Sequence, residues 1–565
     1  MKRHIHFLFF IFALTSFSCN ALKPDEEPAE TAFQVPVSSI ISGQFREIVS
    51  GLPIEDQPIQ VTLASDPPNI IINLDNQPIK GLLTSNSRLS FALDSDVEPN
   101  ENNPIYIHLS AKTDGYIDWQ QTLKIINPKP TSFYADLVPV GSPPPGILLE
   151  KASIQLDSHG RIQSQPLEMM LSSPTNDFRV KAMLPVGTRI LDNQDTPLQG
   201  EINVTFVVYD ARKSKALTQY QNTFATAIDL ADKSKRFSGV IPFLWMDLDI
   251  IDQYGRKGIK FDTVNIAASK QTKTPVSFDK ILQTMMTLNS PFPNHETRST
   301  LQEGDHAMAW NYDQKTKEWT LGQTIAIGSG STFSDLVINA SLPAPGRWAF
   351  GWVIEPCPGG FQLNFSGIPE AYPLRILFTG THGGFRYESQ TLSGQLKMDI
   401  PINMDLDLKV FDIQDRLVAN QPIPQACQAG QQTVAVNSSI DQFTTIRFIA
   451  IDGFCPCNAG VNLKIATLPV WYQAVKPQPQ SPWVFAGITR NGVAEIRGLL
   501  LNTSYVFATW FDGIWYSARV SLADDRPLTT LETFSANIQT ASTQWDSLSF
   551  VIRLSENACE KLCQN

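Results

Sequence analysis

The sequence predicts an all-β protein of tandem β-sandwich modules, with one short helix, after a cleaved N-terminal signal. Short runs that alternate between apolar and polar residues recur along the chain, as at residues 202–209 and 245–250. The 565 residues include 39 Pro and 32 Gly, and only 18% are charged. These values are typical of sheet proteins with many turns. At about 100–200 residues per domain, the chain has room for several modules.

Residues 1–18 have the features of a secretory signal peptide. Lys2 and Arg3 precede an apolar run at residues 7–14. That run is too short to cross a bilayer, for which about 20 residues are needed. We therefore expect a cleaved export signal rather than an N-terminal membrane helix.

Ser18 and Cys19 follow the apolar run, and an acidic cluster comes next at residues 25–30. The arrangement resembles a bacterial lipoprotein signal, and the acidic cluster is similar to the export tag of surface-exposed lipoproteins in Bacteroidota. The resemblance implies an acyl group on Cys19 that anchors the chain to the outer membrane at the cell surface. Residues 19–36 would then be an acylated flexible tether. The alternative is an ordinary signal peptide with an incidental cysteine.

Strand and turn patterns alternate over residues 37–142. A Gly-Leu-Pro-Ile turn at residues 51–54 separates apolar runs at 40–45 and 59–63. This resembles the carboxypeptidase regulatory-like type of β-sandwich, and the resemblance implies one such sandwich over 37–142. A proline-rich stretch at 143–146 marks its exit.

The next region, residues 147–349, is again rich in strand patterns. Ser277 can cap a helix, so we expect one short helix over residues 278–288. The rest of the region is predicted to be sheet.

The last third suggests an internal repeat of about 100 residues. The segment 352–365 finds an echo in 449–465. One hundred residues is the size of an immunoglobulin-like sandwich. We therefore predict immunoglobulin-like sandwiches at 350–447 and 448–565, the second with a C-terminal tail. Chance similarity between short strand patterns is the alternative.

Besides Cys19, the chain has six cysteines, and all lie in its last third: Cys357, Cys427, Cys455, Cys457, Cys559 and Cys563. An even number in an exported chain favours disulfides. The preferred pairing joins Cys357 or Cys427 to the region of Cys455 and Cys457, with the terminal cysteines paired locally or back to that region. A zinc site built from the last four cysteines is the alternative.

One loop concentrates carboxylates. Asp94, Asp96 and Glu98 alternate between two strand patterns and could ligate calcium, the only cofactor that the sequence suggests. A solvated acidic loop is the alternative. The net charge of −11 argues against nucleic acid as a partner.

Aromatic residues are dense near the C-terminus. Trp471, Trp483 and Trp515 are predicted to be exposed and are the candidate ligand-binding residues, while Trp510 is predicted to lie in the core. Because no catalytic motif appears, we expect a non-catalytic binding or adhesion protein with a glycan or protein ligand at the cell surface. The alternatives are a glycan-binding lipoprotein that uses these aromatics and an enzyme with a dispersed site.

Overall fold

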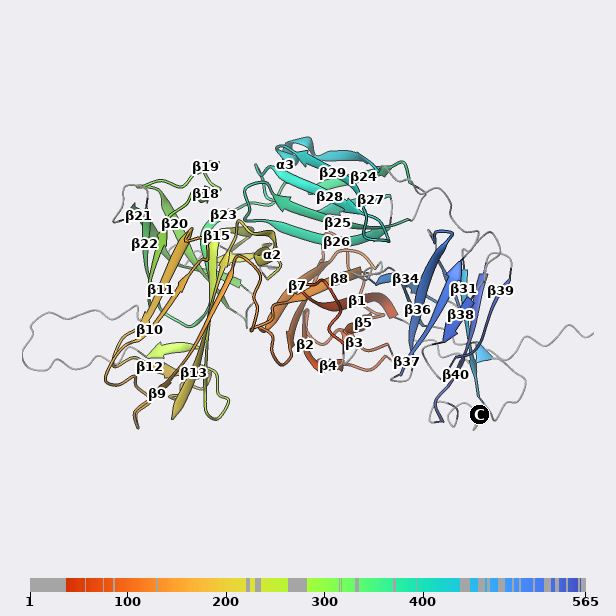
Figure 1. Cartoon of the computed structure of the whole chain (residues 1–565), viewed down its shortest axis with the longest axis horizontal. Helices are drawn as coiled ribbons and strands as arrows, with labels where there is room; N and C mark the ends of the chain where they lie inside the picture. Colours follow the sequence, from red (N-terminus) through yellow and green to blue (C-terminus); the bar gives the residue numbers. More distant parts are fainter. Residues whose placement is uncertain are drawn as a thin grey trace, which may run out of the picture. The chain divides into compact units, whose positions relative to one another are not determined.

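The structure is a computed structural model that describes most of the chain from residue 37 onward. The described residues form two compact units, 37–436 and 448–559. Nearly all of their regular elements are β-strands, so the predicted all-β class is confirmed (Figure 1). No described helix is both long and apolar enough to cross a membrane. The described residues are 37–55, 57–74, 76–84, 87–128, 131–219, 224–228, 235–262, 282–313, 316, 318–330, 335–368, 372–392, 394–436, 448–455, 463–464, 468–475, 483–489, 492–496, 499–511, 514–522, 530–533, 538–544, 547–556 and 559.

The first unit begins with a β-sandwich, which we call the first module (residues 37–137). Its two sheets have the strand orders β3-β5-β1-β8 and β4-β2-β6-β7. In β2, the buried side chains occupy every second position, as expected for a strand with one face on a core. Trp119 packs between Phe45 and Phe133, at ring-centroid distances of 6.0 and 6.1 Å. The strands are β1 (Val37–Glu47), β2 (Ile59–Asp66), β3 (Ile71–Ile72), β4 (Gly81–Thr84), β5 (Arg88–Asp94), β6 (Ile105–Lys112), β7 (Trp119–Ile125) and β8 (Thr131–Leu137).

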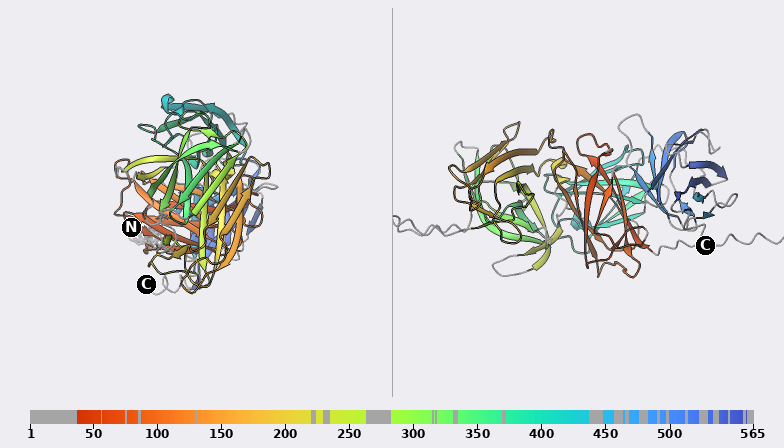
Figure 2. Two further views of the ribbon diagram at one scale, coloured as in Figure 1. Left: turned by 90° about the vertical axis from the view of Figure 1, so that its left-hand side faces the viewer. Right: turned by 90° about the horizontal axis from the view of Figure 1, so that it is seen from below.

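The second module (residues 147–354) is built on one eleven-stranded sheet. Strands β9 and β10, which end the strand order, lie side by side. The backbone N–H of Met170 donates a hydrogen bond of 2.7 Å to the Glu150 carboxylate across this contact. The sheet therefore curls around one core, while residues on its other face, such as Tyr209 and Trp245, form a second buried cluster with Ile48 of the first module (Figure 2). Its strands are β9 (Ile147–Gln155), β10 (Leu167–Ser172), β11 (Phe178–Leu184), β13 (Glu201–Asp210), β14 (Phe224–Ile228), β15 (Lys235–Asp252), β17 (Leu282–Leu288), β20 (His306–Asp313), β21 (Glu318–Ser329), β22 (Leu336–Leu342) and β23 (Gly346–Ile354).

Smaller elements complete this module. Two short pairs lie outside the main sheet, and a four-residue helix follows β13. They are β12 (Arg189–Leu191) with β16 (Lys260–Asp262), β18 (Pro293–Asn294) with β19 (Ser299–Thr300), and α2 (Ser214–Leu217).

The helix predicted over 278–288 is wrong. Residues 278–281 lie outside the described residues, and Leu282–Leu288 is strand β17, paired with β11 and β22. Leu282, Met286 and Leu288 are buried while Gln283 is exposed, which is the period of two of a strand. A second correction concerns the boundary at 349/350, because β23 (Gly346–Ile354) pairs with β15 and β20 in the sheet of the second module.

The third module (residues 355–436) is a smaller sandwich. Its sheets have the orders β27-β24-β30 and β26-β25-β28-β29. A disulfide between Cys357 and Cys427 joins the start of this module to its four-residue helix α3 (Ala426–Ala429). The strands are β24 (Phe361–Ser366), β25 (Pro373–Gly380), β26 (Arg386–Leu392), β27 (Gln395–Met398), β28 (Leu406–Phe411), β29 (Leu417–Ile423) and β30 (Gln431–Ala435).

One type of turn recurs in the second and third modules. An aspartate begins the turn, and its Oδ1 accepts hydrogen bonds of 2.8–3.0 Å from the backbone N–H groups two and four residues later. The fourth residue has a positive φ and is glycine or aspartate. The side chain therefore supplies the acceptor that closes each turn. The four aspartates are Asp157, Asp192, Asp252 and Asp412.

The C-terminal unit is a sandwich of two five-stranded sheets. The first strand pairs in parallel with the last, and the disulfide Cys455–Cys559 lies beside the ends of both. One sheet contains β31 (Phe448–Phe454), β32 (Leu463–Lys464), β35 (Val493–Glu495), β39 (Ile538–Gln544) and β40 (Ser547–Arg553). The other contains β33 (Pro469–Ala474), β34 (Val484–Ile488), β36 (Thr503–Phe511), β37 (Ile514–Leu522) and β38 (Thr530–Thr533).

Candidate binding site at the junction of three modules

A buried group of charged side chains, which we call the junction cluster, joins the first module to the third. It consists of Arg46, Asp136, Arg375, Arg386 and Glu388. The Glu388 carboxylate accepts hydrogen bonds from Arg375 at 3.0 Å, from Arg46 at 3.5 Å, and from Arg386. The Nε of Arg46 also donates to Asp136 at 2.6 Å. All five side chains are less than 15% exposed.

The surroundings of Glu388 decide its protonation state. Burial acts to raise the pKa of its carboxyl, but the guanidinium groups of Arg46, Arg386 and Arg375 outweigh burial and lower the pKa from 4.5 to about 2. Burial likewise acts to lower the pKa of Arg46, while Asp136 and Glu388 raise it by more. Glu388 and Arg46 are therefore both charged at neutral pH.

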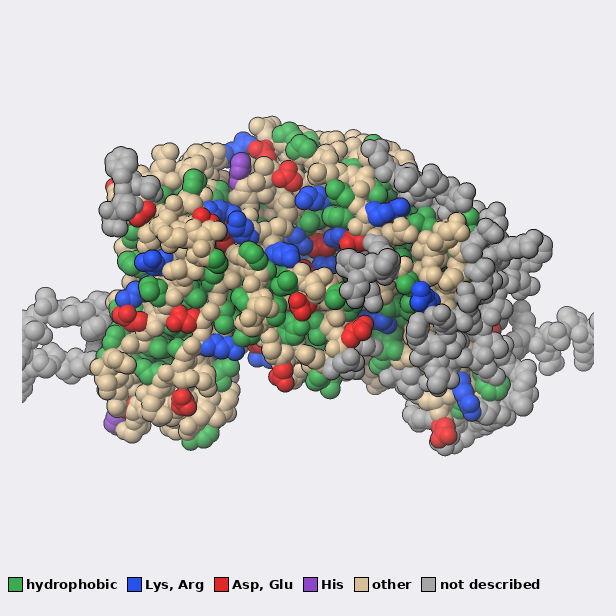
Figure 3. Space-filling model, viewed as in Figure 1, with side chains coloured by type: hydrophobic (Ala, Val, Ile, Leu, Met, Phe, Trp, Pro, Cys, Tyr) green, Lys and Arg blue, Asp and Glu red, His purple; other side chains and the backbone are tan. Residues whose placement is uncertain are grey.

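A cavity of about 450 Å³, the junction cavity, adjoins this cluster. It runs along the open seam of the first module between β7 and β8, the edge strands of the two sheets. Strands β26 and β27 of the third module and residues at the end of α2 form its other walls. Figure 3 shows positive and negative side chains gathered in a hollow where the first and third modules meet. The volume lies within the range of about 300–1,000 Å³ that is typical of small-ligand sites.

Each of the described charged side chains that line the junction cavity is in an ion pair. Two pairs bridge the first and third modules: Lys124 lies 2.6 Å from Asp399, and Lys397 lies 2.8 Å from Glu101. The remaining charged lining residues, Asp136, Arg386 and Glu388, belong to the junction cluster. An occupant of the cavity therefore meets charged side chains that are already neutralised by their ion-pair partners.

Uncharged polar groups complete the wall. The Oε1 atom of Gln121, on β7, is buried and accepts no hydrogen bond from the described residues. Ser132, on β8, donates a hydrogen bond of 3.1 Å to Gln390, whose amide donates to the hydroxyl of Tyr134. Thr122 is hydrogen-bonded to His108 at 2.9 Å. The wall thus combines hydroxyl and amide groups with the rings of tyrosines.

Backbone contacts fix the second module against the other two. Gly384 donates a backbone hydrogen bond of 2.8 Å to Ala211, and the side chain of Gln219 donates to the backbone oxygen of Asp136. A Cβ atom on Gly383 would lie 2.4 Å from the oxygen of Ala211, so only glycine allows this approach. The walls of the junction cavity are therefore held by direct contacts among all three modules.

A second cavity, of about 300 Å³, lies between the β18–β19 hairpin and the third module. His295 lines it, and burial together with the charge of His382 lowers the His295 pKa from 6.5 to about 4. Arg298 and Asp405 form an ion pair of 3.4 Å at the same cavity. No group of three or more metal-ligating side chains occurs here or elsewhere in the described part of the chain.

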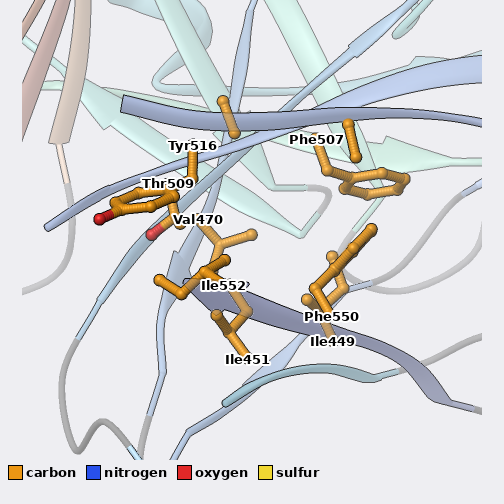
Figure 4. A pocket seen from close by; sticks show the side chains of 10 residues that line it. Ile449, Ile451, Val470, Phe507, Thr509, Tyr516, Phe550 and Ile552 are labelled. Atoms are coloured by element: carbon orange, nitrogen blue, oxygen red, sulfur yellow. The ribbon is translucent and has the colours of Figure 1, made fainter. Parts of the chain in front are cut away.

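The C-terminal unit has a small apolar void of about 20 Å³ between its sheets. Figure 4 shows Val470, Phe507 and Phe550 among the side chains that enclose it. A space of this size holds at most about one water molecule. The void is therefore a packing feature of the core.

The exposure predicted for two tryptophans is wrong. Trp471 is 2% exposed and Trp483 is 4% exposed. Trp471 lies in β33, whose six residues are all buried, and its ring contacts Phe485 of the neighbouring strand β34 at a centroid distance of 5.1 Å. The core assignment of Trp510 is also wrong, because Trp510 and Trp515 are both half-buried and contact each other at a ring distance of 5.3 Å.

The acidic loop has a structural role in the first module. Oδ1 of Asp94 accepts a hydrogen bond of 3.1 Å from the backbone N–H of Asp96, which closes a turn after β5. Asp94, Asp96 and Glu98 are not arranged as a metal site. The sequence interpretation as a calcium site is therefore not supported by their geometry.

The cysteine pairing differs in part from the prediction. Cys357 bonds to Cys427 within the third module, so neither joins the region of Cys455 and Cys457 as expected. Cys559 does pair back to that region, through Cys455, and this bond replaces the alternative of four zinc thiolates. Cys19, Cys457 and Cys563 lie outside the described residues.

Sequence reasoning missed the junction cavity altogether. Arg46 and Glu388 are 342 positions apart in the chain, and no local pattern marks either as a binding residue. A faint signal exists in the Arg-Tyr-Glu sequence at residues 386–388, where two charges alternate on one face of a strand. Their partners come from other modules and are visible only in the fold.

No protein-family model matches this chain, and no curated protein matches it. Among solved structures, the chain is similar to the pilus adhesin SpaC of Lactobacillus rhamnosus GG, with 9% identity and a TM-score of 0.15 over 88% of this chain and 56% of that one. It thus spans about half of SpaC. The full-length major pilin SpaD of Corynebacterium diphtheriae gives 8% identity and a TM-score of 0.12, over 91% and 96% of the chains. The major pilin BcpA of Bacillus cereus gives 7% and 0.10, over 91% and 98%. At these TM-scores the likeness carries no conclusion about function.

Proposed function

We propose that this chain is a lipid-anchored, non-catalytic binding or adhesion protein of the bacterial outer membrane and cell surface. The signal-like segment with Ser18 and Cys19 supports export and acylation. The disulfides Cys357–Cys427 and Cys455–Cys559 fit an oxidising compartment outside the cytoplasm. Acylation at Cys19 supplies the membrane attachment.

The observation that carries the binding function is the junction cavity with its paired charges. A general acid or base works best with a pKa near the operating pH. The carboxyl of Glu388 has a pKa of about 2 and is held by three arginines. Its proton affinity is therefore too low for acid–base catalysis at neutral pH. A ligand-sized space lined by such fixed groups suits recognition better than turnover.

Anchoring is tested with the full chain and its Cys19→Ala variant in cells. The wild type is expected in the outer-membrane fraction with the mass of an acylated product, and external protease should digest it. The variant should leave that fraction or remain unprocessed. A variant that stays in the membrane with the processed mass of the wild type would refute the lipid anchor.

Binding is tested with the purified full chain in detergent on a glycan array and in pulldowns from cell-surface extracts. A saturable ligand that the chain releases without chemical change is the expected result. Chemical conversion of a bound ligand would favour the enzyme alternative. Failure of every glycan and every surface protein to bind would overturn the binding function.

A further inference from the structure

The junction cavity has a composition that selects among classes of ligand. The described part of its wall has seven charged residues, and because all seven are in ion pairs, none of them is left unpaired for a phosphate, a carboxylate or an amine. Separating one of the buried pairs of the junction cluster would leave its partner as an uncompensated buried charge, which is costly. The occupant that this wall favours is therefore uncharged.

The same wall can exchange several hydrogen bonds with an occupant. The side chain of Gln121 lines the cavity, and its Oε1 has no hydrogen-bond donor among the described residues, so the amide can turn to accept one from a ligand. The hydroxyl of Ser132 uses its hydrogen for Gln390, so its oxygen can still accept a hydrogen bond. Groups that both donate and accept, such as hydroxyls, match this pattern.

Aromatic rings supply apolar faces beside these polar groups. Tyr106 on β6 and Tyr387 on β26 line the cavity from the first and third modules, and both are partly exposed. A tyrosine ring offers a broad apolar surface with little side-chain freedom to lose. A flat, partly apolar molecule with hydroxyl groups around its edge can pack its face on the tyrosine rings and donate hydrogen bonds to the acceptors in the wall.

We infer that the junction cavity binds a short neutral saccharide. The inference rests on the proposed binding function and names its ligand class. Its site differs from the C-terminal aromatics that the sequence suggested for a glycan. Gln121 accepts a hydrogen bond from a sugar hydroxyl, and Tyr106 packs on a sugar ring at the mouth.

The test is calorimetric titration of the full chain in detergent with neutral di- and trisaccharides of glucose, mannose, galactose, xylose and N-acetylglucosamine. Inorganic phosphate and acidic disaccharides serve as charged probes. The expected result is binding of at least one neutral saccharide and of no charged probe. Preference for a charged probe, or no binding of any neutral saccharide at millimolar concentration, would overturn the inference.

Variants locate the site. Gln121→Ala is expected to weaken saccharide binding about tenfold, the effect of losing roughly 1.4 kcal/mol. Gln283→Ala, on an exposed position of β17, is the matched control and should bind like the wild type. Tyr106→Ala, at the mouth of the junction cavity, is a second test of the site. This variant should weaken saccharide binding even if Gln121→Ala proves unstable. If Tyr106→Ala, Gln283→Ala and the wild type bind the saccharide with equal affinity, the saccharide binds outside the junction cavity.

The outcomes separate this inference from the proposed function. If the chain captures a surface protein but no neutral saccharide, the binding function stands and the saccharide site does not. If the chain binds a saccharide with unchanged affinity in the cavity variants, the ligand class stands and the cavity does not. Absence of any ligand in both experiments would remove both.

Discussion

The C-terminal unit and the three-module unit both bury large aromatic side chains, but they differ in the space that packing leaves open. In the C-terminal unit, aromatics such as Phe507 and Tyr505 fill the sandwich and leave a void of only about 20 Å³. In the three-module unit, each module has its own packed core, but the junction leaves about 450 Å³ lined by paired charges, amides and hydroxyls. Aromatic density thus marks packing here, and space for a ligand arises where separately folded modules meet.

The physical reason lies in how each space is closed. Facing sheets can interdigitate apolar side chains until almost no gap remains. The first and second modules also share buried apolar residues. At the junction cavity, in contrast, the first and third modules meet mainly through polar side chains, and ion pairs such as Lys124–Asp399 bridge them. Gaps between such surfaces remain accessible and polar, which is the character of a binding site.

The contrast is sharpest for the tryptophans of the C-terminal unit. Replacing Trp471 by Ala is expected to lower the free energy of unfolding of that unit by about 3–5 kcal/mol, because a fully buried indole leaves a large cavity. Trp515→Ala, at a half-buried position, should cost about 1–2 kcal/mol. Scanning calorimetry of the full chain measures both. Equal losses of unfolding free energy would show that the difference in burial between Trp471 and Trp515 has no effect on stability.

In the other unit, the corresponding test removes the charge at the centre of the junction cluster. Glu388→Gln should cost about 3 kcal/mol, because three guanidinium groups would share a buried site with too little negative charge. Glu303→Gln, at an exposed glutamate, is the control and should be close to neutral. Urea unfolding gives both values. A Glu388→Gln variant as stable as the control would show that the cluster does not hold the modules together.

Acid should act on the two units differently. Because the pKa of Glu388 falls from 4.5 to about 2 on folding, its charged form stabilises the three-module unit fully above pH 4.5. That contribution is lost as the pH falls from 4.5 to 2, where the carboxylate becomes protonated. Urea midpoints measured across this interval should fall more steeply for the wild type than for Glu388→Gln. Parallel curves would place the titrating group elsewhere.

The smallest expected effect concerns the void of the C-terminal unit. Oγ1 of Thr509 is buried at this void with no hydrogen-bond partner among the described residues. Thr509→Val keeps the shape and removes that oxygen, so it should raise the unfolding free energy by about 1 kcal/mol. Calorimetry of the C-terminal transition reports the change. A destabilised variant would indicate that a bound water satisfies the hydroxyl.

Local patterns in the sequence correctly predicted the fold class but not every secondary-structure element. The alternation at residues 202–209 correctly predicted part of β13 (Glu201–Asp210), because every second residue from Ile202 faces the core of the second module. The same rule, applied to Leu282, Thr284, Met286 and Leu288, would have found β17. The possible cap at Ser277 was given more weight than this period of two, and the helix prediction failed.

What the sequence determined by itself is local: the alternation of strands, the turns that an aspartate closes, and the number of cysteines available for bonding. Each depends on residues a few positions apart, so the chain encodes it directly. The partner of Cys357, the burial of Trp471 and the meeting of Glu388 with Arg46 were decided only by the tertiary structure. These contacts join residues that are distant in the chain, and strand pairing and module packing alone select them.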